Sequence, residues 1–174
     1  AGGASNVAAN LALLGVKTHM TGIVGHDGEA AILIELMNEA SIETSGMVRT
    51  PHRPTVAKTR ILSGHQQMVR LDQESNAPLN TSESSLLLES IKTQLSLKPA
   101  LVILSDYAKG VLSQEICEFV IKQCQAMQIP VLVDPKGHDY SKYAGATALT
   151  PNKKETAEAC MTSTRDPADR KSVG

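Results

Sequence analysis

Two short runs of apolar residues constrain the possible fold more than any other feature of the sequence. These two runs cover residues 100–104 and 130–133. A further expected strand covers residues 146–150. Apolar side chains recur at helical spacing between the first two runs, at Ile116, Val120, Cys124 and Met127. A strand without a polar face is buried on both sides, and two such strands joined by a helix pair most simply in parallel. We therefore expect an α/β fold with a doubly wound, mostly parallel sheet.

The N-terminal part continues this alternation of helices and strands. We expect a helix from about residue 5 that ends before Gly15, then a strand over residues 18–24. A helix over residues 30–40 follows, with Asp27 as its N-cap. Asn80 and Glu83 have the spacing of a capping box at the start of another helix, whose buried side is Leu87, Leu88, Ile91 and Leu95.

Residues 48–74 have a different pattern, typical of a β-hairpin with its turn at residues 63–66. In the second strand Val69 and Leu71 point to one side, whereas Met68, Arg70 and Asp72 point to the other. This segment is expected to be a small hairpin appended to the main sheet. Because its apolar side needs a cover, we expect a homodimer formed through this hairpin.

Composition excludes several classes of function. The 174 residues include 17 Lys and Arg against 18 Asp and Glu, and only 2% are aromatic. Without a basic stripe or stacking aromatics, nucleic acid is not an expected partner. No apolar run approaches the ~18 residues that span a bilayer, so we expect no membrane association and a cytoplasmic location. The three cysteines lack metal spacing and are expected to be reduced core thiols.

Three polar segments follow the apolar strands, at residues 105–110, 134–138 and 150–155. The carboxyl ends of parallel strands share one edge of the sheet, where ligands bind. Each segment carries lysine, and lysines near helix N-termini bind phosphate. Carboxylates there can bind sugar hydroxyls or hold Mg²⁺ through water. The pattern favours a phosphoryl-handling site, while P-loop, dinucleotide, zinc-protease and α/β-hydrolase motifs are absent.

Each of these residues also has a purely structural interpretation. Asn152 and Glu155 have capping-box spacing, and Asp106 and Asp134 can satisfy turn amides. The lysines can be ordinary surface residues. Gly2 and Gly3 either make the chain flexible or let a ligand approach the backbone.

Several motifs together resemble the ribokinase-like (phosphofructokinase-B type) carbohydrate kinases. They are GGASNVAAN at residues 2–10, GIVGHD at 22–27 and NKKE at 152–155. The hairpin at residues 48–74 lies where that family carries its β lid, so the resemblance implies that this segment is a lid. Segments 66–72, 104–110, 133–137 and 145–152 are more specifically similar to the kinase domain of bacterial heptose-7-phosphate kinases, which often precedes an adenylyltransferase.

This resemblance implies ATP- and Mg²⁺-dependent phosphorylation of the anomeric hydroxyl of D-glycero-β-D-manno-heptose 7-phosphate. The 1,7-bisphosphate product would feed ADP-heptose and lipopolysaccharide core synthesis in bacteria. The implied sugar-phosphate ligands are Gly2, Gly3, Asn6, Arg70, Asp106 and Lys109. The implied ATP ligands are Lys136, Asn152, Lys153, Lys154 and Glu155, with Glu155 also facing Mg²⁺ through water.

The sequence departs from the family pattern in two ways. Ala30 stands where many members have glycine. The G-A-G-D segment, whose Asp is the family's catalytic base, is not found in these residues, and neither is the strand before Gly2. We therefore expect residues 1–174 to be a partial kinase domain, inactive by itself. Two alternatives stay open: another kinase of the ribokinase or fructokinase type, and a non-catalytic module that binds sugar phosphates.

Overall fold

The computed structural model describes residues 2–64, 66–137 and 139–163, with no side-chain description for residues 160–163. The chain divides into two compact units, one of residues 1–97 with 109–111 and the other of residues 98–108 with 112–174. The expected turn residue His65 and the thiol of Cys160 lie outside what is described.

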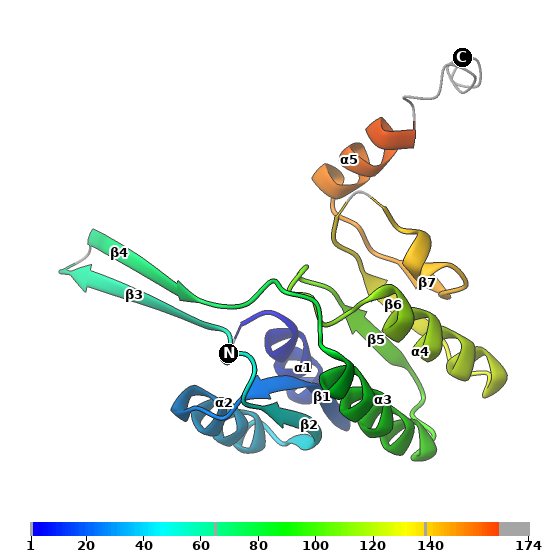
Figure 1. The fold of residues 1–174 in the computed structure, drawn as a ribbon, viewed down its shortest axis with the longest axis horizontal. Helices are drawn as coiled ribbons and strands as arrows, with labels where there is room; N and C mark the ends of the chain where they lie inside the picture. The colour runs from blue at the N-terminus through cyan, green and yellow to red at the C-terminus, as the bar shows by residue number, and fades with distance from the viewer. Residues whose placement is uncertain (1, 65, 138, 164–174) are drawn as a thin grey trace. The chain divides into compact units, whose positions relative to one another are not determined.

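The first unit is built on a pair of parallel strands with helices packed against it (Figure 1). Its elements are α1 (Ala4–Leu13), β1 (Thr18–Gly25), α2 (Gly28–Glu39), β2 (Ile42–Thr50), β3 (Ala57–Ser63), β4 (Gln66–Gln73) and α3 (Thr81–Ser96). β1 pairs with β2 from Thr18↔Ile42 to Gly25↔Thr50. Ala8 of α1, Met37 of α2 and Ile42 of β2 form the centre of a hydrophobic core in this unit.

The expected helix starts in this unit are confirmed. The Asp27 side chain accepts a hydrogen bond from the Ala30 amide and so caps α2. Asn80 and Glu83 form both hydrogen bonds of the capping box at α3. Leu87, Ile91 and Leu95 are the buried stripe of that helix, whereas Leu88 is only partly buried. Local sequence signals therefore fix where these helices begin.

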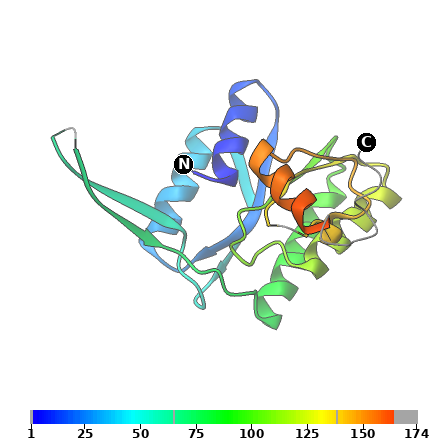
Figure 2. The same cartoon turned by 90° about the horizontal axis from the view of Figure 1, so that it is seen from above.

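β2 is the element that sequence patterning missed, and it changes the bounds of the lid. Residues 48–50, grouped with the hairpin on sequence grounds, lie instead in β2 and pair with β1. The hairpin consists of β3 and β4, paired antiparallel, and we call these two strands the lid. It projects from the rest of its unit in two perpendicular views (Figures 1 and 2).

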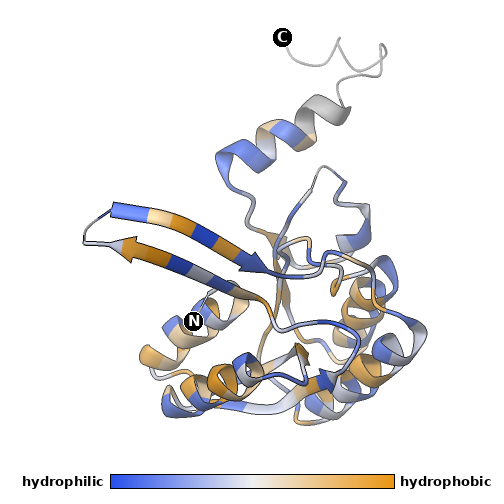
Figure 3. Cartoon of the chain, turned by 60° about the vertical axis from the view of Figure 1, so that its left-hand side comes forward, coloured by the Kyte–Doolittle hydropathy of each residue, from blue (hydrophilic) through white to orange (hydrophobic). Residues whose placement is uncertain are grey.

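The two faces of the lid differ as expected. Ile61 pairs with Val69, and Thr59 with Leu71, so these side chains share one face. Lys58 pairs with Asp72 and Arg60 with Arg70 on the other face. Figure 3 shows the resulting alternation of apolar and polar residues along both strands. Every residue of β4 is exposed, so the described residues of the chain cover neither face of this strand.

The second unit contains the expected parallel sheet, in the order β5-β6-β7. Its elements are β5 (Val102–Ser105), α4 (Gln114–Ala126), β6 (Val131–Asp134), the 3₁₀ turn η1 (Ser141–Tyr143), β7 (Ala148–Leu149) and α5 (Lys153–Ser163). Ile116, Val120 and Cys124 of α4 are buried, as expected. Met127 instead forms the C-cap of α4 and is 37% exposed, because the helix ends just before it.

Two expectations from composition can be compared with this structure. Cys117 and Cys124 are free and buried, and burial raises the pKa of Cys117 to about 11. Both therefore fit unreactive core thiols. None of the described helices combines the length and apolar character needed to cross a membrane.

Candidate functional site

The three polar segments that follow β5, β6 and β7 lie at one edge of the sheet, as expected. These strands are adjacent and parallel, and Ser105 is level with Asp134 in the register. The Asp106 amide donates to the Asp134 carbonyl oxygen at 3.0 Å, and the Thr150 amide donates to the Val133 carbonyl oxygen at 2.8 Å. The carboxyl ends of all three strands therefore meet, which is where open α/β sheets bind ligands.

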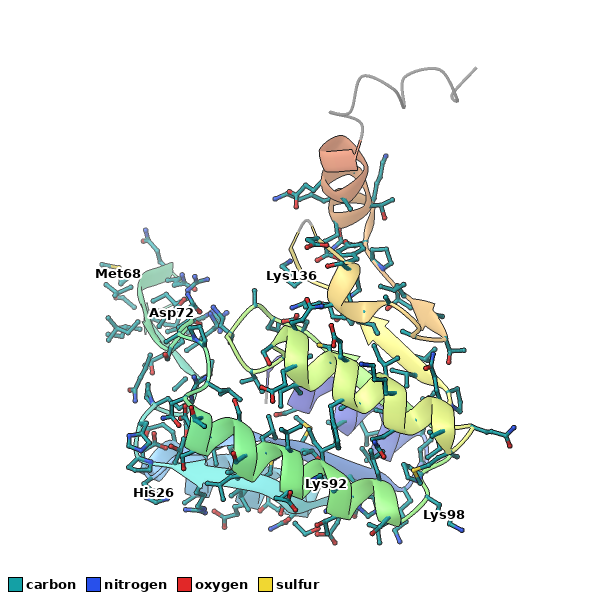
Figure 4. The ribbon with its side chains drawn as sticks, turned by 45° about the vertical axis from the view of Figure 1, so that its right-hand side comes forward. His26, Met68, Asp72, Lys92, Lys98 and Lys136 are labelled. Atoms are coloured by element: carbon teal, nitrogen blue, oxygen red, sulfur yellow. The ribbon has the colours of Figure 1, made fainter. Side chains whose placement is uncertain are left out.

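An ion pair joins the second of these segments to the third. Lys136 Nζ lies 2.8 Å from Glu155 Oε1, and Figure 4 shows Lys136 below the start of α5. The Glu155 side chain is 8% exposed and that of Lys136 is 48% exposed. The hydrogen bond from Lys136 lowers the pKa of Glu155, and the same contact raises the pKa of Lys136. A half-exposed cation thus sits at the edge of the sheet, available to an anion.

Asn152 and Glu155 also fulfil the structural role that their spacing indicates. The Asn152 amide donates to Glu155 Oε2 at 2.9 Å, and the Glu155 and Lys154 amides donate to Asn152 Oδ1 at 3.0 Å. Lys153 and Lys154 are exposed in the first turn of α5. The capping box therefore occupies part of this helix N-terminus, while two flanking lysines remain at the surface.

Asp134 is a third acidic residue at the same edge, near Glu155 and Asp106. Its pKa is raised by burial and further by the nearby negative charges of Glu155 and Asp106, against the effect of Lys136. A cation near Asp134 and Glu155 would relieve this repulsion. Within the described part of the chain, no group of three or more His, Cys, Asp or Glu side chains could hold a metal ion. Asp134 and Glu155 together match the one or two carboxylates with which Mg²⁺ is usually bound, its other ligands being water and phosphate.

Asp106 is held by two residues that sequence reasoning missed. Its Oδ2 atom accepts hydrogen bonds of 2.6 Å from both Lys142 Nζ and the Tyr143 hydroxyl, and its Oδ1 atom accepts one of 2.7 Å from the Ala108 amide. Asp106 is 5% exposed. Burial and this hydrogen bond raise the pKa of Tyr143, which keeps its hydroxyl a donor. Lys142 and Tyr143 lie in η1, where no periodic pattern marks them.

In the first unit, Gly2, Gly3 and Asn6 lie at the start of α1. Gly3 is the N-cap, with a positive φ of 56° that favours glycine, and no side chain caps the helix. The Asn6 amide donates to the Gly3 carbonyl oxygen at 3.0 Å, and the Asn6 side chain is exposed. A Cβ on Gly2 would meet no atom within 4 Å. This arrangement leaves the backbone at the start of α1 accessible.

The two basic residues expected to bind the sugar phosphate, Arg70 and Lys109, both form ion pairs in the first unit. Arg70 Nε lies 2.9 Å from Asp72 Oδ1, and Lys109 Nζ lies 2.6 Å from Glu74 Oε1. Lys58 bridges the two acids, at 3.2 Å from Asp72 and 3.3 Å from Glu74. Figure 4 shows Asp72 on the lid. Both cations are thus connected through one charged network.

A hollow of about 320 Å³ lies beside the carboxyl ends of β1 and β2 and contains none of the expected site residues. Its lining includes His26, Asp27, His52 and Arg53. The Asp27 carboxylate accepts hydrogen bonds from Thr55 and from the Ala30 amide. Arg53 forms an ion pair with Glu83 and donates to backbone carbonyl oxygens. The charged groups of Asp27 and Arg53 in this hollow therefore stabilise the fold.

Comparison with known proteins identifies the class. The pfkB family of carbohydrate kinases matches residues 1–173, and the chain belongs to that family. Among curated proteins, it is 57% identical over 166 residues to the bifunctional protein HldE of Methylobacillus flagellatus, covering 95% of this chain and 34% of that protein. It is 46% identical over 156 residues to HldE of Magnetococcus marinus, covering 88% and 32%. The chain thus spans about a third of the length of these relatives.

Solved structures confirm the fold. The chain is similar to phosphofructokinase-2 from Escherichia coli, with a TM-score of 0.69 and 21% identity over 91% of this chain and 51% of that one. It is also similar to Arabidopsis thaliana ribokinase complexed with ribose and ATP, with a TM-score of 0.66 and 19% identity over the same shares. The expected resemblance and α/β fold class are both confirmed.

Proposed function

We propose that the protein containing this chain transfers the γ-phosphoryl group of ATP to the anomeric hydroxyl of D-glycero-β-D-manno-heptose 7-phosphate. The product is the 1,7-bisphosphate used for ADP-heptose and lipopolysaccharide core synthesis. The observation that carries this proposal is the 57% identity to HldE across 95% of the chain. The shared edge of β5, β6 and β7, with its lysines and carboxylates, supports it.

In this proposal, the second unit contributes to binding of the ATP phosphates. Lys136 provides a cation, and Asn152, Lys153 and Lys154 lie around the first turn of α5. Glu155 holds Mg²⁺ through water, with Asp134 as the neighbouring carboxylate. The metal, when bound, neutralises charge that develops on the phosphoryl oxygens. Lys136 has three N–H donors and one contacts Glu155, so two can reach phosphate.

The sugar phosphate is proposed to bind Gly2, Gly3, Asn6, Arg70, Asp106 and Lys109. The Asp106 carboxylate accepts three hydrogen bonds, and a carboxylate has about four acceptor positions. One position is left for a sugar hydroxyl, presented from a carboxylate that Tyr143 and Lys142 hold fixed. Arg70 and Lys109 supply the positive charge for the 7-phosphate.

A second copy of the chain is proposed to cover the apolar face of the lid. Ile61, Val69 and Leu71 share this face, and each is between 45% and 56% exposed. A hairpin of two strands is marginally stable by itself and gains from burying its apolar face. Because the lid projects from its unit, a symmetric pairing of two lids would form a homodimer.

The proposal is tested with the full-length protein, Mg²⁺, ATP and a panel of heptose 7-phosphate, ribose and fructose. ADP release should favour heptose 7-phosphate in kcat/KM by roughly 100-fold or more. A preference for ribose or fructose would assign the protein to another branch of the family. Sugar-phosphate binding in calorimetry without turnover of any sugar would instead favour a non-catalytic binding module.

A further inference from the structure

The segment that carries Lys109 is attached to the base of the lid. Residues 109–111 belong to the first unit, although residues on both sides of them belong to the second. Lys109 Nζ contacts Glu74, the first residue after β4, at 2.6 Å. These side chains are 28% and 20% exposed, so the ion pair is substantially shielded from water. The side chain of Lys109 therefore takes its position from the end of the lid.

The side chain of Arg53 makes the same connection through backbone carbonyl oxygens. Arg53, which precedes β3, donates to the carbonyl oxygen of Lys109 at 3.3 Å and to that of Ala77, which follows β4, at 2.9 Å. Its side chain is 7% exposed and is paired with Glu83 at 3.3 Å. Arg53 thus joins both ends of the lid to residue 109.

Gly110 fits closely against the same segment. A Cβ at this position would overlap the carbonyl group of Ala77, and its φ of +75° favours glycine. The backbone of Gly110 is therefore packed against the backbone of Asn76 and Ala77. A movement of the lid base would carry Lys109 with it.

The ion pair with Glu74 leaves the Lys109 ammonium able to bind an anion, because the lysine side chain is still 28% exposed. The Lys109 ammonium has three donors and Glu74 takes one of them. Two donors therefore remain for a phosphate group while the ion pair with Glu74 persists.

We propose that Glu74 is a positioning residue for the sugar 7-phosphate, because it holds the Lys109 ammonium at the base of the lid. The position of this cation relative to the phosphate therefore depends on the position of the lid. Glu74 itself contacts no substrate in this proposal. The inference rests on the proposed function, because that function assigns Lys109 to the 7-phosphate. It adds a residue that couples phosphate binding to lid position.

The kinetic test uses the full-length protein with Glu74→Gln, and Lys58→Gln as the matched control. Lys58 is the other partner of Glu74, so this control breaks an ion pair of the same carboxylate and leaves Lys109 in place. Glu74→Gln should raise the KM for heptose 7-phosphate about tenfold, with kcat and the KM for ATP unchanged. Lys58→Gln should change none of the three. A fall in the sugar-phosphate KM with Glu74→Gln would mean that Glu74 competes with the phosphate and would overturn the proposal.

A double-mutant cycle and a labelling experiment separate this inference from the proposed function. In a Lys109→Met background, Glu74→Gln should have no further effect on KM, whereas additive effects would exclude action through Lys109. Without substrate, acetylation of Lys109 followed by mass spectrometry should be several-fold faster in Glu74→Gln than in wild type or Lys58→Gln. Equal rates would overturn the inference even if the sugar specificity proves different, because this readout needs no turnover.

Discussion

The hydroxyl of Tyr143 donates a 2.6 Å hydrogen bond to Oδ2 of Asp106, which connects η1 to the segment after β5. Tyr143 is 1% exposed, and Asp106 directly follows β5 at the carboxyl edge of the parallel sheet. A buried phenol thus fixes the direction of a carboxylate at the candidate site. Lys142 approaches the same oxygen atom and supplies the compensating positive charge.

Tyr143→Phe removes this hydrogen bond and leaves the ring in place. A hydrogen bond to a charged group contributes about 1.5–3 kcal/mol, and we expect a loss of stability in this range. Urea denaturation measures this loss of stability when unfolding is monitored with a probe placed in residues 98–108 or 112–163. Tyr140→Phe is a control of the same chemistry on the neighbouring ring. Equal, negligible effects of the two substitutions would contradict the importance of the Asp106 contact.

Gly110→Ala tests the close packing of residues 109–111 on the base of the lid. A left-handed conformation costs a non-glycine residue about 1–2 kcal/mol, and the overlap with Ala77 adds about 1–3 kcal/mol. Gly64→Ala is the matched control, because Gly64 also has a positive φ and its Cβ would meet nothing within 4 Å. Thermal unfolding of the two variants gives the comparison. If Gly64→Ala is as destabilising as Gly110→Ala, the steric contact contributes nothing.

The ion pair between Lys136 and Glu155 predicts a specific dependence on pH. The folded pKa of Glu155 lies below its ordinary value of 4.5, chiefly because of the hydrogen bond from Lys136. The stability from this ionised carboxylate is therefore complete above about pH 4.5 and is lost as the pH falls through the lowered pKa. Titration of the Glu155 carboxyl carbon by NMR should give a pKa that rises when Lys136 is replaced by Met. An unchanged pKa in Lys136→Met would show that this contact does not form in solution.

The apolar face of the lid predicts the oligomeric state. Val69→Asp together with Leu71→Asp places charge on the face that a second lid would cover, so light scattering should show a dimer for the full-length wild type and a monomer for the variant. Lys58→Gln, on the opposite face, should leave the dimer intact. A wild-type protein that is monomeric would remove the proposed pairing of lids.

The elements that the sequence predicts well are those with a strong local signal. The capping box of Asn80 and Glu83 marks the start of α3, because both hydrogen bonds lie within one helical turn. The apolar runs around Leu104 and Val133 identify β5 and β6, although only Leu104, Val131 and Val133 are fully buried and the other residues of these strands are partly exposed. At the candidate site, the segments after these strands share an edge because parallel pairing places all carboxyl ends together.

The parts that could not be predicted depend on distant contacts or partial burial. β2 contains Glu43, Thr44 and Ser45 and is buried only at intervals, so its sequence has no apolar run. The partner of Asp106 lies 37 residues away in η1, and no local spacing connects it with Tyr143. Arg53 similarly joins the lid to residue 109 from a position that gives no sequence signal.

The most direct test of the proposed activity is ³¹P NMR of the product formed by the full-length protein from heptose 7-phosphate, ATP and Mg²⁺. The account predicts one new phosphomonoester on the anomeric carbon, formed in equal amount to ADP, while the 7-phosphate signal persists. ATP hydrolysis without a new sugar phosphate, or phosphorylation at a different carbon, would contradict it.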